Sequence, residues 1–449
     1  MSSSGMEFLF STPAMSAAFS PSRQLRAMAE FEWALACALE RAGLADPGSG
    51  DVLKRHLDAK FVDQKALQEG AGSAGNIAIP FIRQLTACVK MDYEAMARTI
   101  HLGATSQDVL DTALVLQIRE ALVLILEAID RLDGALARQT RAHAQIILTG
   151  RTWLQPAPPT TLGLKLAGTL SALRRHRTRI TEAAKRGIVL QFGGAVGTLA
   201  ALGSDGPAVS AELARILDLR EPEAPWHTQR DSLVELAAVM ALLTGTLGKF
   251  ARDISLLMQA EVGEAAEPAG EDKGGSSTMP QKQNPVGCAA ILACAARIPG
   301  LLATLLGAMA QEHERGLGLW QAESATLPAV FQLAAAALER SIEIADNLVA
   351  DAGRMMDNLN ARLGLNQAEA VSVALAREMG RETAHELLQR ACRQAAETGV
   401  HLAAVLKTMP DVTGHLRTEE IDRLLDPRQY LGSAQRYIGR VLGDVDASR

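Results

Sequence analysis

Residues 111–147 read DTALVLQIREALVLILEAIDRLDGALARQTRAHAQII, with no proline and a single glycine, Gly134. Apolar residues recur through this stretch at three- and four-residue steps, which is the period of one helix face. At a rise of 1.5 Å per residue, one helix over the stretch would extend about 50 Å. That length exceeds what a small globular domain needs and suits a helix bundle shared between subunits.

Four further long helical patterns follow, beginning near residues 160, 232, 285 and 323. Shorter helical patterns, broken by glycine and proline, precede residue 111 and follow residue 350. No stretch shows a convincing strand pattern. The sequence therefore predicts an all-α fold of three helical domains, residues 1–110, 111–350 and 351–449, in which the middle domain is an elongated bundle.

Composition narrows the class of protein. Hydrophobic residues make up 48% of the chain and aromatic residues 4%, so the core must be aliphatic, which favours close-packed helices. The net charge of −6 and the lack of a basic tract argue against nucleic-acid binding. The five cysteines have no CxxC spacing and indicate reduced thiols. No His, Cys and carboxylate cluster has metal-ligand spacing, and we expect neither metal nor cofactor.

The sequence also predicts a protein of the cytoplasm. The N-terminal residues lack the basic region and apolar run of a signal peptide. The most apolar tract, residues 236–247, is about a dozen residues long before Lys249 interrupts it, which is too short to cross a bilayer. We therefore expect no membrane partner.

Residues 274–285, GGSSTMPQKQNP, interrupt the helical patterns. Adjacent glycines allow backbone N–H groups to converge on an anion, and Lys282 adds a positive charge. A serine hydroxyl in such a field can exchange a proton with carbon. On chemistry alone, a polar loop between helices explains the stretch equally well.

The same stretch resembles the signature of the fumarase/aspartase superfamily, Gly-Ser-x-x-Met-x-x-Lys-x-Asn. Every fixed position matches: Gly275, Ser276, Met279, Lys282 and Asn284. The resemblance implies central bundles that associate into a twenty-helix tetramer core, and a loop that closes over a substrate carboxylate. It also implies that Ser277 transfers a proton at carbon, while Lys282 and Asn284 stabilise an enediolate-like intermediate.

Other segments extend the resemblance over nearly the whole chain: residues 101–108 (HLGATSQD), 150–163, 226–231 (WHTQRD) and 311–315 (QEHER). The resemblance implies catalytic roles for Ser276, Ser277 and Lys282, and substrate-binding roles for His101, Thr105, Ser106, Thr152, Trp153, Gln155, Arg230, Met279, Asn284 and Arg315. Taken alone, Ser106 or Asp108 is equally a helix cap, and each arginine is better explained by a salt bridge. His227 and His313 fit structural hydrogen bonds.

One departure from the superfamily pattern is informative. Most eliminating members have Thr-His where this chain has Thr152-Trp153, and that histidine serves the leaving group. A lactonising enzyme needs no such group, because its nucleophile is the substrate's own carboxylate, which is ionised at neutral pH. Trp153 would give a flat apolar wall for a conjugated diene, with a core tryptophan at a bend as the alternative. The resemblance thus points to lactonisation of 3-carboxy-cis,cis-muconate in aromatic-compound breakdown.

Several alternatives stay open. Gln281, Gln283 and Pro156 stand where similar muconate enzymes often carry His or Arg, so 3-sulfomuconate or another substituted muconate is a possible substrate. A fumarate-releasing lyase of the adenylosuccinate type and a non-enzymatic relative, as among lens crystallins, are competing hypotheses. In each enzymatic case the resemblance implies a small di- or tricarboxylate substrate and a homotetramer, with every site assembled from three subunits.

Overall fold

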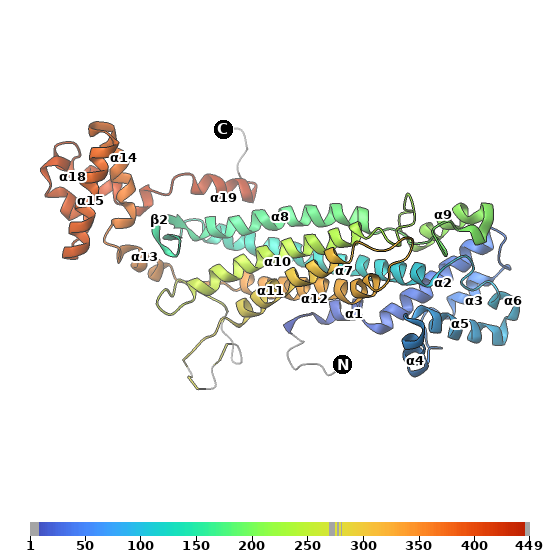
Figure 1. The fold of residues 1–449 in the computed structure, drawn as a ribbon. Coiled ribbons are helices and arrows are strands. Elements are labelled where there is room, and N and C mark those ends of the chain that lie inside the picture. Colours follow the sequence, from blue (N-terminus) through green and yellow to red (C-terminus); the bar gives the residue numbers. More distant parts are fainter. Residues whose placement is uncertain (1–8, 269–273, 276–277, 280, 445–449) are drawn as a thin grey trace. The chain divides into compact units, whose positions relative to one another are not determined.

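The computed structural model describes residues 9–268, 274–275, 278–279 and 281–444 (Figure 1). The chain divides into two compact units. The first unit comprises Met1–Ile129, His176–Gly245 and Ala293–Glu339, and the second comprises Asp130–Arg175, Thr246–Leu292 and Arg340–Arg449. The three helical domains expected from the sequence, with boundaries after residues 110 and 350, stay a prediction.

Between residues 106 and 346, the described part of the chain forms five long helices: α7 (Ser106–Ala142), α8 (Leu162–Gly187), α10 (Asp231–Leu257), α11 (Val286–Gly307) and α12 (Leu319–Asp346). They confirm the all-α class and the long helix predicted from residue 111. Helix α7 begins earlier than predicted, because the Asp108 carboxylate accepts a hydrogen bond from the backbone N–H of Thr105. An acid in the first turn satisfies the free donors of a helix N-terminus in this way.

The expectation of no strands is wrong. Strands β1 (Ile147–Thr152) and β2 (Gln155–Thr161) form an antiparallel hairpin, and β3 (Ala265–Ala266) pairs with β4 (Val349–Ala350). Prolines in β2 hide its strand character in the sequence. They are tolerated because β2 pairs with β1 alone in its two-stranded sheet, so one edge needs no N–H donors. A Cβ at Gly150 would lie 2.4 Å from the Pro158 carbonyl oxygen, so the hairpin requires glycine there.

The core of the first unit is built around α2 (Pro21–Arg41), whose N-cap, Ser20, accepts a hydrogen bond from the backbone N–H of Arg23. Met28, Phe31 and Leu35 recur at three- and four-residue steps along this helix and are buried. The same unit contains α1 (Pro13–Ala18), α3 (Ser49–Lys54), α4 (Gln64–Ala74), α5 (Ala78–Asp92), α6 (Glu94–Ala97), the 3₁₀ helix η2 (Ala200–Asp205) and α9 (Gly206–Leu217).

The second unit has a separate aliphatic core near the C-terminus, which includes Val371, Leu375, Leu387 and Leu402. The helices of this part of the chain are α13 (Ala352–Asn360), η3 (Leu365–Gln367), α14 (Ala368–Met379), α15 (Arg381–Thr398), α16 (Leu402–Lys407), α17 (Pro410–Thr413), α18 (Thr418–Leu424), η4 (Pro427–Gln429) and α19 (Ala434–Leu442). Glycines at positions 364, 380 and 399 separate these helices with positive φ angles, as the glycine breaks in the sequence indicate.

Helices α10 and α11 are long and apolar enough to cross a membrane, judged by length and composition. The apolar tract at residues 236–247 is part of α10, the long helix that the pattern beginning near residue 232 predicts. Most of the apolar window of α10 is buried inside the structure. Core helices of soluble proteins meet the same criterion, so this finding is weak evidence for a membrane span.

Candidate active site

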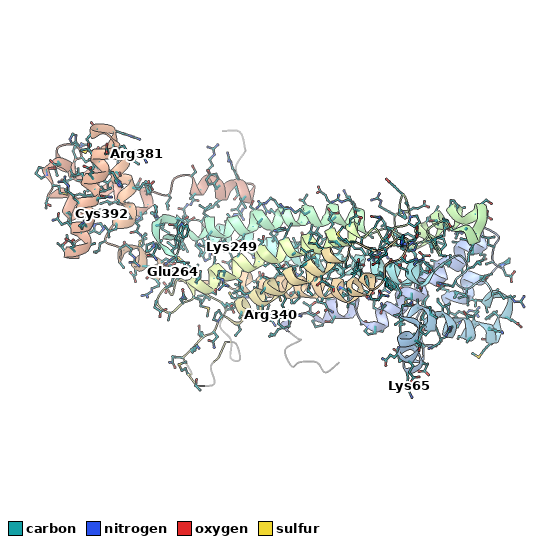
Figure 2. All side chains as sticks on the ribbon, viewed as in Figure 1. Lys65, Lys249, Glu264, Arg340, Arg381 and Cys392 are labelled. Carbon is teal, nitrogen blue, oxygen red and sulfur yellow. The ribbon has the colours of Figure 1, made fainter. Side chains whose placement is uncertain are left out.

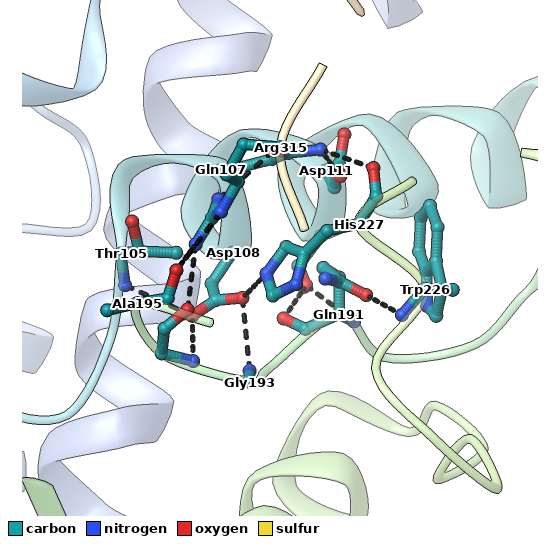
Figure 3. A network of polar contacts seen from close by, with 12 residues as sticks. Thr105, Gln107, Asp108, Asp111, Gln191, Gly193, Ala195, Trp226, His227 and Arg315 are labelled. Atoms are coloured by element: carbon teal, nitrogen blue, oxygen red, sulfur yellow. Dashed lines mark hydrogen bonds and ion pairs between the residues drawn. The ribbon is translucent and has the colours of Figure 1, made fainter. Parts of the chain in front are cut away.

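A buried carboxylate, that of Asp108, joins two of the segments predicted to form the site, residues 101–108 and 226–231, to the turn at Gly193 and Gly194 (Figure 3). Its Oδ2 accepts hydrogen bonds from the backbone N–H of Thr105 at 3.0 Å and of Gly194 at 2.9 Å. Its Oδ1 accepts from the backbone N–H of Gly193 at 3.1 Å and contacts Nε2 of His227 at 2.6 Å. The capping role weighed for Asp108 is confirmed, and His227 has the structural role expected for a lone histidine.

Arg315 is half-buried beside this carboxylate, on the segment before α12. Its Nη2 donates to the carbonyl oxygens of Gly194 at 2.7 Å and Ala195 at 3.1 Å, and its Nη1 donates to Oε1 of Gln107 at 3.0 Å (Figure 3). Burial lowers the pKa of Arg315, and the charge of Asp108 offsets this only partly. These acceptors are neutral, so the guanidinium stays an incompletely compensated cation that can attract an anion.

Arg230 has a different environment, although it was predicted to have the same role. All five of its N–H groups have acceptors, because the guanidinium forms ion pairs with Asp111 and Glu323 and Nη1 also approaches the carbonyl of His227. Burial lowers the pKa of Arg230, but the two carboxylates outweigh burial and the net pKa is raised. The geometry gives Arg230 a supporting role, and its contact with substrate stays a prediction.

Three further predicted residues of the first unit follow one another: His101 and Thr105 lie in the turn of residues 101–105, and Ser106 begins α7. His101 has a φ of +64°, which is uncommon for a residue with a side chain. Gly103 has a φ of +77°, and a Cβ there would come within 2.6 Å of Leu202. Strained backbone of this kind concentrates at functional sites.

In the second unit, the β1–β2 hairpin presents Thr152, Trp153 and Gln155. Trp153 is 98% exposed and Leu154 75% exposed. Their φ angles are +52° and +62°, the left-handed conformation of both central residues in a type I′ turn. The alternative of a core tryptophan is therefore wrong for this chain alone. Two bulky apolar residues in a strained, exposed turn are unusual and need an explanation.

The hairpin is anchored just behind its tip. The guanidinium of Arg151 donates to both oxygens of Glu264, at 2.8 and 2.6 Å. Nδ2 of Asn358 donates to Glu264 Oε1 at 2.8 Å. The Glu264 side chain, labelled in Figure 2, is fully buried. A bidentate ion pair to a buried carboxylate holds its partners in one geometry. Because Arg151 is two residues before Trp153, this ion pair restrains the position of the hairpin tip.

The signature segment also lies in the second unit. Ser276 and Ser277 fall outside the described residues. The backbone N–H and Nδ2 of Asn284 both donate to the carbonyl oxygen of Gly274, at 2.8 and 3.0 Å. Met279, Lys282 and Asn284 line a cavity of about 700 Å³. The predicted anion-binding groups of this segment therefore border a cavity large enough for a small polycarboxylate.

Glu267, a buried residue that precedes the signature segment, is bonded to the start of the helix that follows the segment. Its Oε2 accepts from the backbone N–H of Gly287 at 2.9 Å, and its Oε1 from that of Cys288 at 2.6 Å. These donors belong to the first turn of α11, where a carboxylate is favourable. Glu267 therefore fixes the point at which the segment re-enters a helix.

Comparisons with known proteins agree with these observations. A lyase family model matches residues 12–300, and a model of the adenylosuccinate lyase C-terminus matches residues 364–441. The chain belongs to this family, the fumarase/aspartase superfamily.

Similar proteins cover nearly the entire chain. The 3-carboxy-cis,cis-muconate cycloisomerase of Pseudomonas aeruginosa is 51% identical over 98% of this chain and 95% of its own length. The crystal structure of 3-carboxy-cis,cis-muconate lactonizing enzyme from Pseudomonas putida is 48% identical with a TM-score of 0.93 and covers 98% of each chain. That of beta-carboxy-cis,cis-muconate cycloisomerase from Acinetobacter calcoaceticus is 39% identical with a TM-score of 0.92, covering 98% of this chain and all of that one.

The predicted residues of this superfamily member fall into two groups. The first unit holds His101, Thr105, Ser106, Arg230 and Arg315, and the second holds Thr152, Trp153, Gln155, Met279, Lys282 and Asn284. Sequence reasoning missed the buried acids that support the first group, Glu32, Asp111 and Glu323. Glu32 had a detectable signal, because it lies at helical spacing from Met28 and Leu35 on an otherwise apolar face.

No group of three or more His, Cys, Asp and Glu side chains that could hold a metal occurs among the described residues. The absence of a metal and of a cofactor accordingly stays a prediction.

Proposed function

We propose that this enzyme lactonises 3-carboxy-cis,cis-muconate. The observation that carries the proposal is Trp153, exposed at the hairpin tip, where an apolar wall stands in place of the histidine of eliminating lyases. The name borne by near full-length relatives supports it. The substrate class is a small di- or tricarboxylate, and the enzyme is a soluble protein that we place in the cytoplasm.

The reaction moves atoms within one molecule. A carboxylate oxygen of the substrate forms a C–O bond to an alkene carbon, and the electron pair of that alkene moves toward a conjugated carboxylate. The resulting enediolate-like intermediate takes one proton at carbon, and no group leaves. Because the nucleophile is already ionised at neutral pH, the enzyme needs no cofactor to generate it.

Most of the predicted residues have a role in this scheme. Ser277 delivers the proton to carbon with the help of Ser276, while Lys282 and Asn284 stabilise the charge on the conjugated acid. Arg315, Thr105 and Ser106 bind a second carboxylate. Thr152 adds a hydroxyl donor for that carboxylate, Gln155 orients the substrate through its amide, and Trp153 bounds the flat diene. The half-buried position of Arg315 beside neutral acceptors supports its role, because such a cation gains most from an incoming anion.

We further propose a homotetramer in which each site takes residues from three subunits. The predicted residues belong to two separate compact units. In addition, the strained Trp153–Leu154 turn exposes apolar side chains, and exposed apolar surface of this kind is typical of an interface with another subunit. Mass measured by light scattering tests this directly: a monomer with full turnover would contradict it.

The test of function is ultraviolet absorbance of 3-carboxy-cis,cis-muconate mixed with the purified protein, beside its 3-sulfo analogue. Loss of the conjugated-diene band without fumarate in the products is the expected result. Gln281 and Gln283, neutral side chains at the cavity of the signature segment, make the 3-sulfo compound the second candidate, and the faster analogue identifies the substituent. Release of fumarate would instead identify an eliminating lyase. A Ser277→Ala variant with full turnover would remove Ser277 from the scheme.

A further inference from the structure

Glu32 is a buried carboxylate in the apolar core of the first unit. It lies on α2, on the same face as Met28 and Leu35, and is 2% exposed. Its Oε2 has no hydrogen-bond partner among the described residues. Burying a carboxylate with an unpaired oxygen is costly, and a well-packed apolar residue would stabilise such a position better. The position therefore calls for a reason other than stability.

The partner of Glu32 is His101. Oε1 of Glu32 lies 2.7 Å from Nδ1 of His101, across 69 positions of sequence. Burial lowers the pKa of His101, but the charge and the hydrogen bond of Glu32 and the charge of Asp108 outweigh it, and the net pKa is raised. Glu32, from α2, and Asp108, from α7, are the charged groups that act on this imidazole.

The other edge of the imidazole carries Nε2. Nε2 of His101 has no partner among the described residues, while the side chain is 21% exposed. The residue has the uncommon φ of +64°, and its carbonyl accepts a hydrogen bond from the backbone N–H of Ala104. The turn formed in this way leads directly into Thr105, whose backbone N–H is bonded to Asp108 (Figure 3). A protonated imidazole here presents an N–H donor at the anion-binding end of the first unit.

We propose that Glu32 is a positioning residue that keeps His101 protonated and oriented, so that its Nε2–H binds an anionic oxygen of the polycarboxylate substrate. The inference rests on the proposed function only for the class of ligand. A carboxylate behind an imidazole fixes its tautomer and orientation and favours its charged form. With Glu32 behind it, the His101 imidazole acts as a cationic hydrogen-bond donor, a role that a lysine or arginine would otherwise fill.

The proposal is tested by binding of propane-1,2,3-tricarboxylate, measured by calorimetry across pH, for the wild type and Glu32→Gln. The amide keeps an acceptor for Nδ1–H and removes the charge. We expect the pH midpoint above which binding weakens to fall, and the Kd near pH 7.5 to rise about tenfold, the effect of one pKa unit. Glu120→Gln is the matched control, because Glu120 pairs with Arg23 in the same unit, and it should leave the midpoint unchanged.

Three results would overturn the proposal: an unchanged midpoint in Glu32→Gln, unchanged binding in His101→Asn, or a wild type that does not bind the tricarboxylate. If Glu32→Gln does not fold, the pKa of His101 is measured in the wild type by ¹³Cε1-histidine NMR, and the His101→Asn variant assigns the signal. A His101 imidazole that titrates below its ordinary pKa overturns the proposal. The readout does not depend on turnover. A shifted midpoint supports Glu32 even if muconate is not converted, whereas normal conversion with an unshifted midpoint refutes Glu32 alone.

Discussion

The Asp108 network of the first unit and the Trp153 hairpin tip of the second unit differ in burial and in backbone strain. Asp108 is fully buried and each of its oxygens accepts two hydrogen bonds. Trp153 and Leu154 are exposed and adopt a strained backbone conformation. A buried, satisfied network serves rigidity, while strain and exposed apolar surface are retained where function requires them. Substitutions in the network should therefore change stability, and substitutions at the tip should change activity.

The largest effect is expected for Asp108→Ala. The change leaves the N–H groups of Thr105, Gly193 and Gly194 and the buried His227 without their acceptor. Removing one member of a buried charged network costs about 3–5 kcal/mol. The urea midpoint at fixed protein concentration should fall accordingly. Asp58→Ala, at an exposed acid, is the control and should leave the midpoint unmoved; equal midpoints for the two variants would refute the network's structural role.

This network also marks the limit of what the sequence reveals. The body of α7 could be predicted because residues 111–142 lack proline and repeat apolar residues at helical spacing. The predicted end near Ile147 is wrong, because the helix ends at Ala142 and Ile147 already belongs to β1. Its start at Ser106 depends on where the Asp108 carboxylate finds donors, and two of these, Gly193 and Gly194, are 85 and 86 positions away. Local patterns report periodicity, whereas pairings over such distances are set by tertiary packing.

The candidate site divides in the same way. Lys282 and Asn284 could be proposed from the sequence because they occur in a short motif, and Trp153 because it departs from one; their roles stay predictions. Glu323 was missed because its partner, Arg230, is 93 positions away. The hairpin was missed because a proline-rich stretch such as β2 is typical of a loop. The sequence does not show that β2 pairs along one edge only, which is what makes its prolines tolerable.

The second largest effect on stability is expected for Glu267→Ala, at a residue that shares features of both regions. Glu267 is buried like Asp108 but holds the end of the signature segment. Loss of two charge-assisted hydrogen bonds at a buried helix start should cost about 2–4 kcal/mol. Asp63→Ala is the matched control, because Asp63 caps α4 with two backbone bonds at an exposed position. That change should cost only about 1 kcal/mol. Equal shifts in urea midpoint would contradict the assigned role of burial.

At the tip, Trp153→Ala should leave the urea midpoint of the isolated chain nearly unchanged and lower kcat/KM for the muconate by about 10–100-fold, or roughly 1.4–2.8 kcal/mol. The reason is that Trp153 contributes little to the packing of its own chain but bounds the proposed diene site. Met91→Ala, which truncates another exposed apolar side chain, should affect neither quantity. A large loss of stability with unchanged kcat/KM would reverse the comparison between the two regions.

The smallest effect is expected at Leu154, where two substitutions distinguish the cost of backbone strain from the contribution of the side chain. Leu154 has a φ of +62°, and glycine adopts that conformation without penalty. Leu154→Gly should therefore stabilise the hairpin by about 0.5–1 kcal/mol relative to Leu154→Ala, which removes nearly the same side chain but keeps the strain. Both variants should lower turnover similarly if the side chain, and not the backbone conformation, serves the site. Urea midpoints and kcat/KM measured on the pair distinguish these cases. Equal midpoints would mean that the turn stores no strain, and the exposed tip would then differ from the Asp108 network in burial alone.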